Sequence, residues 1–329
     1  MLTGQESIAD LIKRFPKAKK VLRECGIAAE AAKQGPYKNL AHAAIAQKLS
    51  LQKILQKLSA VTGEPVRATK VSGMGGAGSQ KTGLRRGTPE GIKRVLAVHS
   101  GKGGVGKTFV AINLALGLAS KGARVGLLDA DVDCPNVMKV LGLKGTLAAN
   151  GAEKIVPLEY QSGAGRTLKV LSMAPMLKNE DDVLMWRGPI VSRVVDQFIH
   201  DTAWGELDFL VVDLPPGTSD IPLTIFHILE GAELIVVTTP QELALLDARR
   251  AIKMARQMNA KIIGLIENMS GEIFGGGEKA KIGGVQLSKD LKIPFLGSIP
   301  LDAGFAAHPL AGTSQKIFDQ ILKRSGIEH

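Results

Sequence analysis

The chain has 329 residues, of which 45% are hydrophobic and only 4% aromatic, so it is long enough for two globular domains with largely aliphatic cores. Its two cysteines exclude a disulfide framework and a four-thiolate metal site within one chain, and they indicate a reducing, cytoplasmic setting. The formal net charge is +11, and the whole excess lies in residues 1–93, which carry 17 Lys and Arg against 6 Asp and Glu.

We expect no targeting or membrane-spanning segment. The start of the chain carries Glu6 and Asp10 and has no apolar run, unlike a signal peptide. A transmembrane helix requires about 18 or more apolar residues in succession, and the sequence has no such stretch. These observations predict a cytoplasmic protein without integral membrane contact.

Residues 1–61 are expected to form a small helical domain. Ser7 and Asp10 have the spacing of a helix-capping box, and Pro16 separates a first helix from a second. Apolar residues recur at helical spacing in three stripes that we expect to form a core: Ile8, Leu11, Ile12 and Phe15; Val21 and Leu22; and Leu49, Leu51, Ile54, Leu55 and Leu58.

Residues 62–91 differ from both neighbours in composition. Their eight glycines and few large apolar side chains predict a flexible, basic linker. The positive charge of residues 1–93 suits an acidic protein, anionic lipid or nucleic acid, or simply keeps this part of the chain well solvated. Nucleic acid is the less favoured partner, because the basic residues lack the regular interleaving of aromatic residues typical of a binding groove.

Residues 92–329 alternate short apolar runs with helical patterns. The runs predict strands buried on both faces at 94–99, 124–128, 168–172, 209–213, 234–238, 261–267 and 294–299. Because helical patterns connect them, we expect right-handed crossovers and a doubly wound, mostly parallel α/β sheet, preceded by the small all-α domain. Ligands of such sheets bind at the carboxyl ends of the strands.

A phosphate-binding loop directly follows the first of these strands. Residues 101–108 read Gly-Lys-Gly-Gly-Val-Gly-Lys-Thr, which fits the pattern Gly, four residues, Gly-Lys-Ser/Thr, and a helical pattern continues from 109 to 120. Glycines let backbone N–H groups turn toward phosphates, and the helix N-terminus adds the positive end of its dipole. The ATP-binding residues expected here are Gly101, Lys102, Gly103, Gly104, Val105, Gly106, Lys107 and Thr108.

The chemistry expected of this loop is that of a Mg²⁺-dependent ATPase. Lys107 is expected to reach the β- and γ-phosphates, and the Thr108 hydroxyl to bind Mg²⁺. Asp213, at the end of a strand, is expected to hold Mg²⁺ directly or through water, and Asp131 to orient the attacking water. Lys102 is a second loop lysine that its own site does not need, so we expect it to supply positive charge across a dimer.

The loop resembles the deviant phosphate loop of the MinD/ParA/nitrogenase iron protein class of P-loop NTPases. Further motifs are similar to those of the narrower Mrp/ApbC group of ATP-dependent iron–sulfur cluster carriers, and the likeness runs from about residue 92 to 312. The motifs are Met185–Pro189, Trp204–Asp208, Asp213–Thr218, Thr238–Gln241, Ala244–Arg249 and Glu267–Ser270.

This resemblance implies a homodimer with two ATP molecules at its interface, in which Lys102 reaches the nucleotide of the second copy. Asp131 would lie in the first switch, and Asp213–Gly217 would form the second switch with the Gly217 N–H near the γ-phosphate. Asn268 matches the position that reads the adenine edge. The partners that the resemblance implies are iron–sulfur apo-proteins or assembly proteins.

Two departures from the family concern the cysteines. The family typically carries Cys-x-x-Cys shortly after Glu-Asn-Met-Ser, whereas residues 271–276 read Gly-Glu-Ile-Phe-Gly-Gly. The N-terminal part resembles a small helical domain found beside iron–sulfur and cluster-repair proteins, but Ala29 and Ala32 stand where that domain commonly has thiols. An iron–sulfur cluster would thus lack its usual ligands. Cys134 could share one across a dimer only with two further ligands, and Cys25 is expected to pack at a helix end.

An alternative stays open: a regulatory or spatial-organising ATPase like MinD or ParA, which binds membrane or DNA and which the basic N-terminal part favours. Residues 315–327 predict only a short amphipathic helix, which is weak as a membrane anchor. An electron-donating reductase like the nitrogenase iron protein needs two well-placed cysteines in the main domain, where only Cys134 occurs. The six histidines show no metal-ligand spacing and receive no role.

Overall fold

The computed structural model describes residues 8–25, 27, 51–64, 84–132, 134–161, 167–176, 188–218, 220–271, 283–302, 304 and 313–327. They fall into two compact units, one within the first 83 residues together with Ala148–Ile155, and a larger one that begins at Leu84. Within the described ranges no helix has both the length and the hydropathy needed to cross a bilayer.

Three helices of the first unit share a small aliphatic core. α1 (Ile8–Arg14) ends before Pro16, which cannot donate a helical hydrogen bond; α2 (Ala18–Glu24) follows, and α5 spans Leu51–Thr62. The core consists of Ile8, Leu11, Ala18, Val21, Leu22, Ile27, Ile54, Leu55 and Leu58. The predicted apolar stripes therefore form or pack against this core where their side chains are described, whereas Ser7, Leu49 and the side chain of Leu51 lie outside the described part.

Eight strands of the larger unit form one sheet, in the order β10-β9-β8-β1-β7-β2-β6-β5. The strands are β1 (Ile92–His99), β2 (Val125–Asp129), β5 (Leu158–Gln161), β6 (Thr167–Leu171), β7 (Leu207–Asp213), β8 (Glu233–Thr238), β9 (Lys261–Ser270) and β10 (Phe295–Pro300). Neighbouring strands are parallel except β5 and β6 at one edge. The predicted doubly wound, mostly parallel α/β sheet is confirmed.

Three short strands were not among the predicted strands. β5 is the antiparallel edge strand, and β3 (Ala148–Ala149) pairs with β4 (Ile155–Val156) in a separate two-stranded sheet. Side chains of β5 alternate between half-buried and exposed, so this strand lacks the continuous apolar run that marks the central strands. A short 3₁₀ turn, η1 (Ala174–Met176), follows β6.

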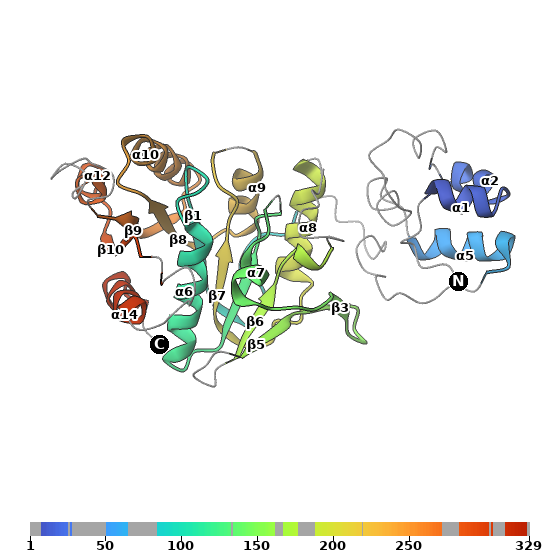
Figure 1. Ribbon diagram of the computed structural model, residues 1–329, viewed down its shortest axis with the longest axis horizontal. Coiled ribbons are helices and arrows are strands. Elements are labelled where there is room, and N and C mark those ends of the chain that lie inside the picture. The colour runs from blue at the N-terminus through green and yellow to red at the C-terminus, as the bar shows by residue number, and fades with distance from the viewer. Residues whose placement is uncertain are drawn as a thin grey trace. The chain divides into compact units, whose positions relative to one another are not determined.

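The direction of each connection assigns the helices to the two faces of the sheet (Figure 1). α6 (Lys107–Ser120) leads from β1 toward the β5 edge. Four helices lead the opposite way: α8 (Gly188–His200), α9 (Asp220–Ile228), α10 (Glu242–Gln257) and α12 (Gly283–Leu291). Because crossovers are right-handed, connections of opposite direction lie on opposite faces.

α6 is apolar on nearly all sides because it lies between the sheet and a second helical layer. α14 (Thr313–Ser325) covers it through Phe318 and Leu322, and α7 (Val137–Leu141) adds Val137 to the same core. Such burial is worth about 25 cal/mol per Å² of apolar surface, so packing on nearly all sides stabilises α6. It begins at Lys107, two residues earlier than predicted, which makes the loop lysine its first residue.

The chain enters the larger unit along the amino ends of the strands. Arg85 Nη2 lies 3.0 Å from Oδ2 of Asp196 and 2.8 Å from Oδ2 of Asp201, both near the end of α8. This contact fastens the last part of residues 62–91, the segment that the sequence predicts as a linker, while 65–83 lie outside the described residues. The predicted domain boundaries stay predictions.

Candidate functional site

The loop between β1 and α6 depends on glycines for its shape. Gly104 and Gly106 have φ angles of +79° and +82°, in the left-handed region that other residues rarely adopt. A Cβ on Gly101 would lie 2.1 Å from the carbonyl oxygen of Asp247 in α10. The absence of that side chain lets the loop lie directly against α10.

At the base of the loop, Lys107 lies between two carboxylates. Its Nζ is 2.6 Å from Oδ1 of Asp213 and 3.5 Å from Oδ2 of Asp131. The Thr108 hydroxyl donates to Oδ2 of Asp213 at 2.6 Å. Because α6 begins with Lys107 and Thr108, while β7 ends at Asp213 and Asp131 follows β2, four predicted site residues meet at the carboxyl ends of neighbouring strands.

The carboxylates of this region are perturbed by burial. Asp213 is fully buried, and burial raises its pKa while the Lys107 ammonium opposes the rise. Burial also raises the pKa of Asp129, with the charge of Asp213 as a second cause. Asp129 accepts from the Val137 N–H at 3.2 Å and the Ser172 hydroxyl at 3.0 Å. It thereby supports the end of β2, a role that the sequence analysis did not assign.

The segment after β7 is tied to the base of the loop. The Gly217 N–H donates to the Ser100 carbonyl at 2.8 Å, and the Leu214 N–H donates to the Val98 carbonyl at 3.0 Å. The Ser100 hydroxyl donates to the Lys102 carbonyl at 2.9 Å, a support within the loop that the sequence analysis missed. The proximity of the Gly217 N–H to a γ-phosphate stays a prediction.

Asn268, near the end of β9, contacts the loop directly. Its side chain is buried, and its Nδ2 donates to the Val105 carbonyl at 2.9 Å. A Cβ on Gly106 would lie 2.1 Å from the same nitrogen. In this structure the amide holds the loop, and its recognition of adenine stays a prediction.

The outer rim of the loop faces solvent. Lys102, Gly103 and Gly104 are exposed, as are Leu243 and Leu246 at the start of α10, with exposed fractions of 66% and 42%. This exposure suits the predicted contact of Lys102 with a second copy.

The described thiols are far fewer than a cluster needs. Cys134 is exposed, and its N–H donates to Oδ1 of Asp131 at 3.4 Å. Cys25 is half-buried at the end of α2 and packs against the core of the first unit, as predicted. Across the described ranges no group of three or more His, Cys, Asp and Glu side chains could hold a metal ion. Residues 177–187 and 272–282 lie outside those ranges. They include the start of the Met185–Pro189 motif and most of the segment where the family typically carries Cys-x-x-Cys.

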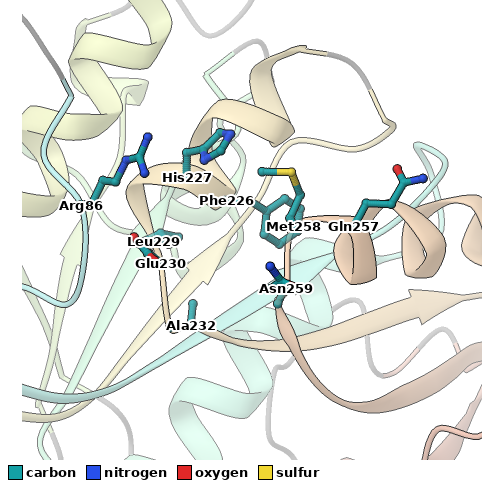
Figure 2. A pocket seen from close by; sticks show the side chains of 11 residues that line it. Arg86, Phe226, His227, Leu229, Glu230, Ala232, Gln257, Met258 and Asn259 are labelled. Carbon is teal, nitrogen blue, oxygen red and sulfur yellow. The ribbon is translucent and has the colours of Figure 1, made fainter.

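A hollow of about 280 Å³ lies near the amino ends of the strands, away from the phosphate loop. Figure 2 shows it between the turns that follow α9 and α10, with Phe226, Leu229 and Met258 among its lining side chains. These turns lead into the amino ends of β8 and β9, whereas the phosphate loop lies at the carboxyl ends. The hollow is therefore separate from the loop site.

Comparisons with known proteins point to one group. The ParA family model, described as "NUBPL iron-transfer P-loop NTPase", matches residues 91–322. An iron–sulfur cluster carrier protein of Methanocaldococcus jannaschii is 43% identical over 222 residues, which are 64% of this chain and 73% of that protein. A cytosolic Fe–S cluster assembly factor, the NUBP2 homolog of Culex quinquefasciatus, is 43% identical over 68% of this chain and 89% of its own length.

Coverage varies among the relatives. The iron–sulfur cluster carrier protein of Synechocystis is 42% identical over 65% of this chain, and the match spans only 62% of that protein's length. A solved structure, a nucleotide-binding protein of Archaeoglobus fulgidus in complex with ADP, is similar with a TM-score of 0.55 and 32% identity, covering 73% of this chain and 90% of that one.

Gly106→Ala is expected to lower the free energy of unfolding by about 3 kcal/mol or more, because the new Cβ adds a collision with the Asn268 amide to left-handed strain of about 1–2 kcal/mol. Gly142→Ala is the matched control, since Gly142 has a φ of +63° and nothing within 4 Å of an added Cβ. Urea unfolding of both variants measures the difference. Equal losses would contradict a tight contact between Asn268 and the loop.

Proposed function

The chain belongs to the ParA family of iron-transfer P-loop NTPases, and on this premise we propose that it is an ATP-hydrolysing switch of iron–sulfur cluster assembly. Two copies bind two ATP molecules between the exposed rims of their loops. Relatives that bear the name iron–sulfur cluster carrier protein support this function over other roles of the fold.

The buried contact of Lys107 with Asp213 is the observation that carries the proposal. An ammonium held 2.6 Å from a carboxylate, next to a turn of glycine N–H groups, is a positive charge placed where phosphate oxygens arrive. With ATP in the loop, Lys107 turns from the carboxylates to the β- and γ-phosphates. The N–H groups of residues 101–106 complete the cradle.

The residues at this point fit a magnesium ion. Thr108 and Asp213 present a hydroxyl and a carboxylate whose oxygens are 2.6 Å apart, and hard oxygen donors are the ligands that Mg²⁺ prefers. Thr108 would hold the ion directly, and Asp213 directly or through water. When bound, Mg²⁺ offsets the negative charge that develops on the transferred phosphoryl group.

Hydrolysis uses groups from both copies. Asp131 orients the attacking water, Lys102 of the second copy supplies positive charge at the γ-phosphate, and the Gly217 N–H binds a γ-phosphate oxygen. Asn268 contacts the adenine edge. Because these contacts to the γ-phosphate are lost on hydrolysis, ATP closes the dimer and its cleavage reopens it.

The cargo and partners follow from the relatives, and the thiols limit how the cargo is held. We assign iron–sulfur apo-proteins or assembly proteins as partners, in the cytoplasm. Two copies of Cys134 supply at most two thiolates, whereas a cluster of the common kind takes four. The chain thus acts as a regulator of cluster transfer, or holds a cluster only through additional, non-standard ligands.

Lys107→Ala is expected to weaken ATP binding by about 100-fold or more, because the charged contact to two phosphates is lost. Lys121→Ala is the control, since Lys121 directly follows the far end of α6 and pairs with Asp319 there. Titration calorimetry with Mg²⁺-ATP measures both affinities. Wild-type affinity in Lys107→Ala would refute the loop assignment.

Asp131→Ala is expected to retain ATP but to lose hydrolysis by about 100-fold or more, because no group then orients the water. Its ATP-bound dimer should persist longer than that of the wild type. Phosphate release and size-exclusion chromatography with ATP measure the two effects. Normal turnover would count against the role of Asp131.

Anaerobic reconstitution with iron and sulfide is expected to give a chromophore well below one cluster per dimer, because the usual bridging thiols are absent. Visible absorbance, with iron and sulfide counted per dimer, checks this. A stoichiometric cluster that survives gel filtration would show that other ligands replace the missing thiols.

A further inference from the structure

His99, the last residue of β1, is a buried polar group without a hydrogen bond. Its side chain is fully buried, and neither Nδ1 nor Nε2 has a hydrogen-bond partner. Buried polar atoms are nearly always paired, and one left unpaired costs about 1–3 kcal/mol. A histidine retained at this depth, directly before the phosphate loop, therefore calls for an explanation.

The groups around His99 indicate which hydrogen-bond partner the ring could gain. Weak hydrogen bonding to the backbone of Pro215 and Gly217 acts to raise the pKa of the ring, yet neither contact has the geometry of a full hydrogen bond to a ring nitrogen. Burial, with the Lys107 charge as a second cause, outweighs them and lowers the pKa to about 4. The ring is thus neutral at physiological pH and carries one N–H donor.

The segment that faces this donor is the second switch, Asp213–Gly217. In this structure the Gly217 N–H is occupied by the carbonyl of Ser100, 2.8 Å away. To bind a γ-phosphate oxygen, that N–H must leave Ser100, so the segment must shift. A shift of this segment also changes the alignment of its carbonyls with the His99 ring.

The packing of His99 links its ring to the same part of the chain. The Phe226 ring of α9 meets the His99 ring edge-on, with centroids 5.5 Å apart. Because α9 is the helix that directly follows the second switch, both the segment and its helix adjoin the His99 ring.

We propose that His99 is a positioning residue: once Asp213–Gly217 closes on the terminal phosphate of ATP, a ring N–H of His99 donates to a backbone carbonyl of that segment and holds the Gly217 N–H toward the phosphate. The inference rests on the proposed function and deepens it. His99 touches neither the nucleotide nor the water, and it acts by stabilising the closed segment. With ADP, which lacks the γ-phosphate, the segment does not close and the ring has no hydrogen-bond partner.

Substitution of the ring nitrogens separates this role from simple packing. His99→Phe keeps an aromatic ring and its contact with Phe226 but removes both nitrogens. We expect its affinity for a non-hydrolysable ATP analogue with Mg²⁺ to fall about 3- to 10-fold relative to its affinity for ADP, the fold-change of one hydrogen bond. The unfolding midpoint without nucleotide should stay the same or rise, because no native hydrogen bond is lost.

The matched control is Ser288→Ala. The Ser288 hydroxyl is also buried without a partner, but it lies in α12, outside the phosphate loop, the second switch and the family motifs. Its ratio of ATP-analogue to ADP affinity should equal that of the wild type. An unchanged ratio in His99→Phe would overturn the proposal. If the wild type bound neither ATP nor ADP, the proposed ATPase function itself would be wrong. That outcome differs from normal nucleotide binding with an unchanged ratio in His99→Phe, which would overturn only the role of His99.

A spectroscopic measurement on the wild type keeps the test independent of the variant's folding. With ¹⁵N-labelled histidine, the ring nitrogen signals of His99 should move when the ATP analogue replaces ADP, as the N–H gains an acceptor. The His99 signals are identified as those missing from the spectrum of His99→Phe, and the ring is expected to stay neutral down to about pH 5 because burial lowers its pKa to about 4. Signals that are identical with both nucleotides would refute a new hydrogen bond.

Discussion

A single buried ion pair, Lys107 with Asp213, joins the parts on which the site depends. A lysine ammonium is expensive to bury unless a carboxylate accepts it, so this pair fixes the first turn of α6 against the end of β7. The register of the sheet makes the pairing feasible, because Val98 on β1 stands opposite Asp213 on β7. One residue of slip would turn Asp213 to the other face and leave the lysine unpartnered.

The central sheet was predictable because its strands are buried on both faces and therefore read as continuous apolar runs. Leu207–Asp213 and Val125–Asp129 are buried at every position, and the helices between such runs set the parallel order. β5 could not be found in this way, since only alternate residues of an edge strand are covered. Its pairing with β6 is decided by long-range contact, which no local pattern encodes.

The residues of the site also differ in how far they could be predicted from the sequence. Lys107 and Thr108 follow from a motif whose spacing is dictated by chemistry, and Asp213 follows from its position at the end of a predicted strand. The structure brings the three side chains together. Asn268 was placed by resemblance alone, and its bond to the Val105 carbonyl became evident only in three dimensions. His99 gave no signal in the sequence, because what sets it apart is the absence of a partner at full burial.

The anchoring of Arg85 separates two ends of the larger unit. Arg85 is clamped by Asp196 and Asp201 at the amino edge of the sheet, whereas Lys102 stands exposed at the carboxyl edge. If two copies met through the exposed loop residues around Lys102, the Arg85 contact of each copy would lie on the side away from the other copy. Opening and closing of the contact between the two rims would then leave the ion pairs of Arg85 in each copy undisturbed.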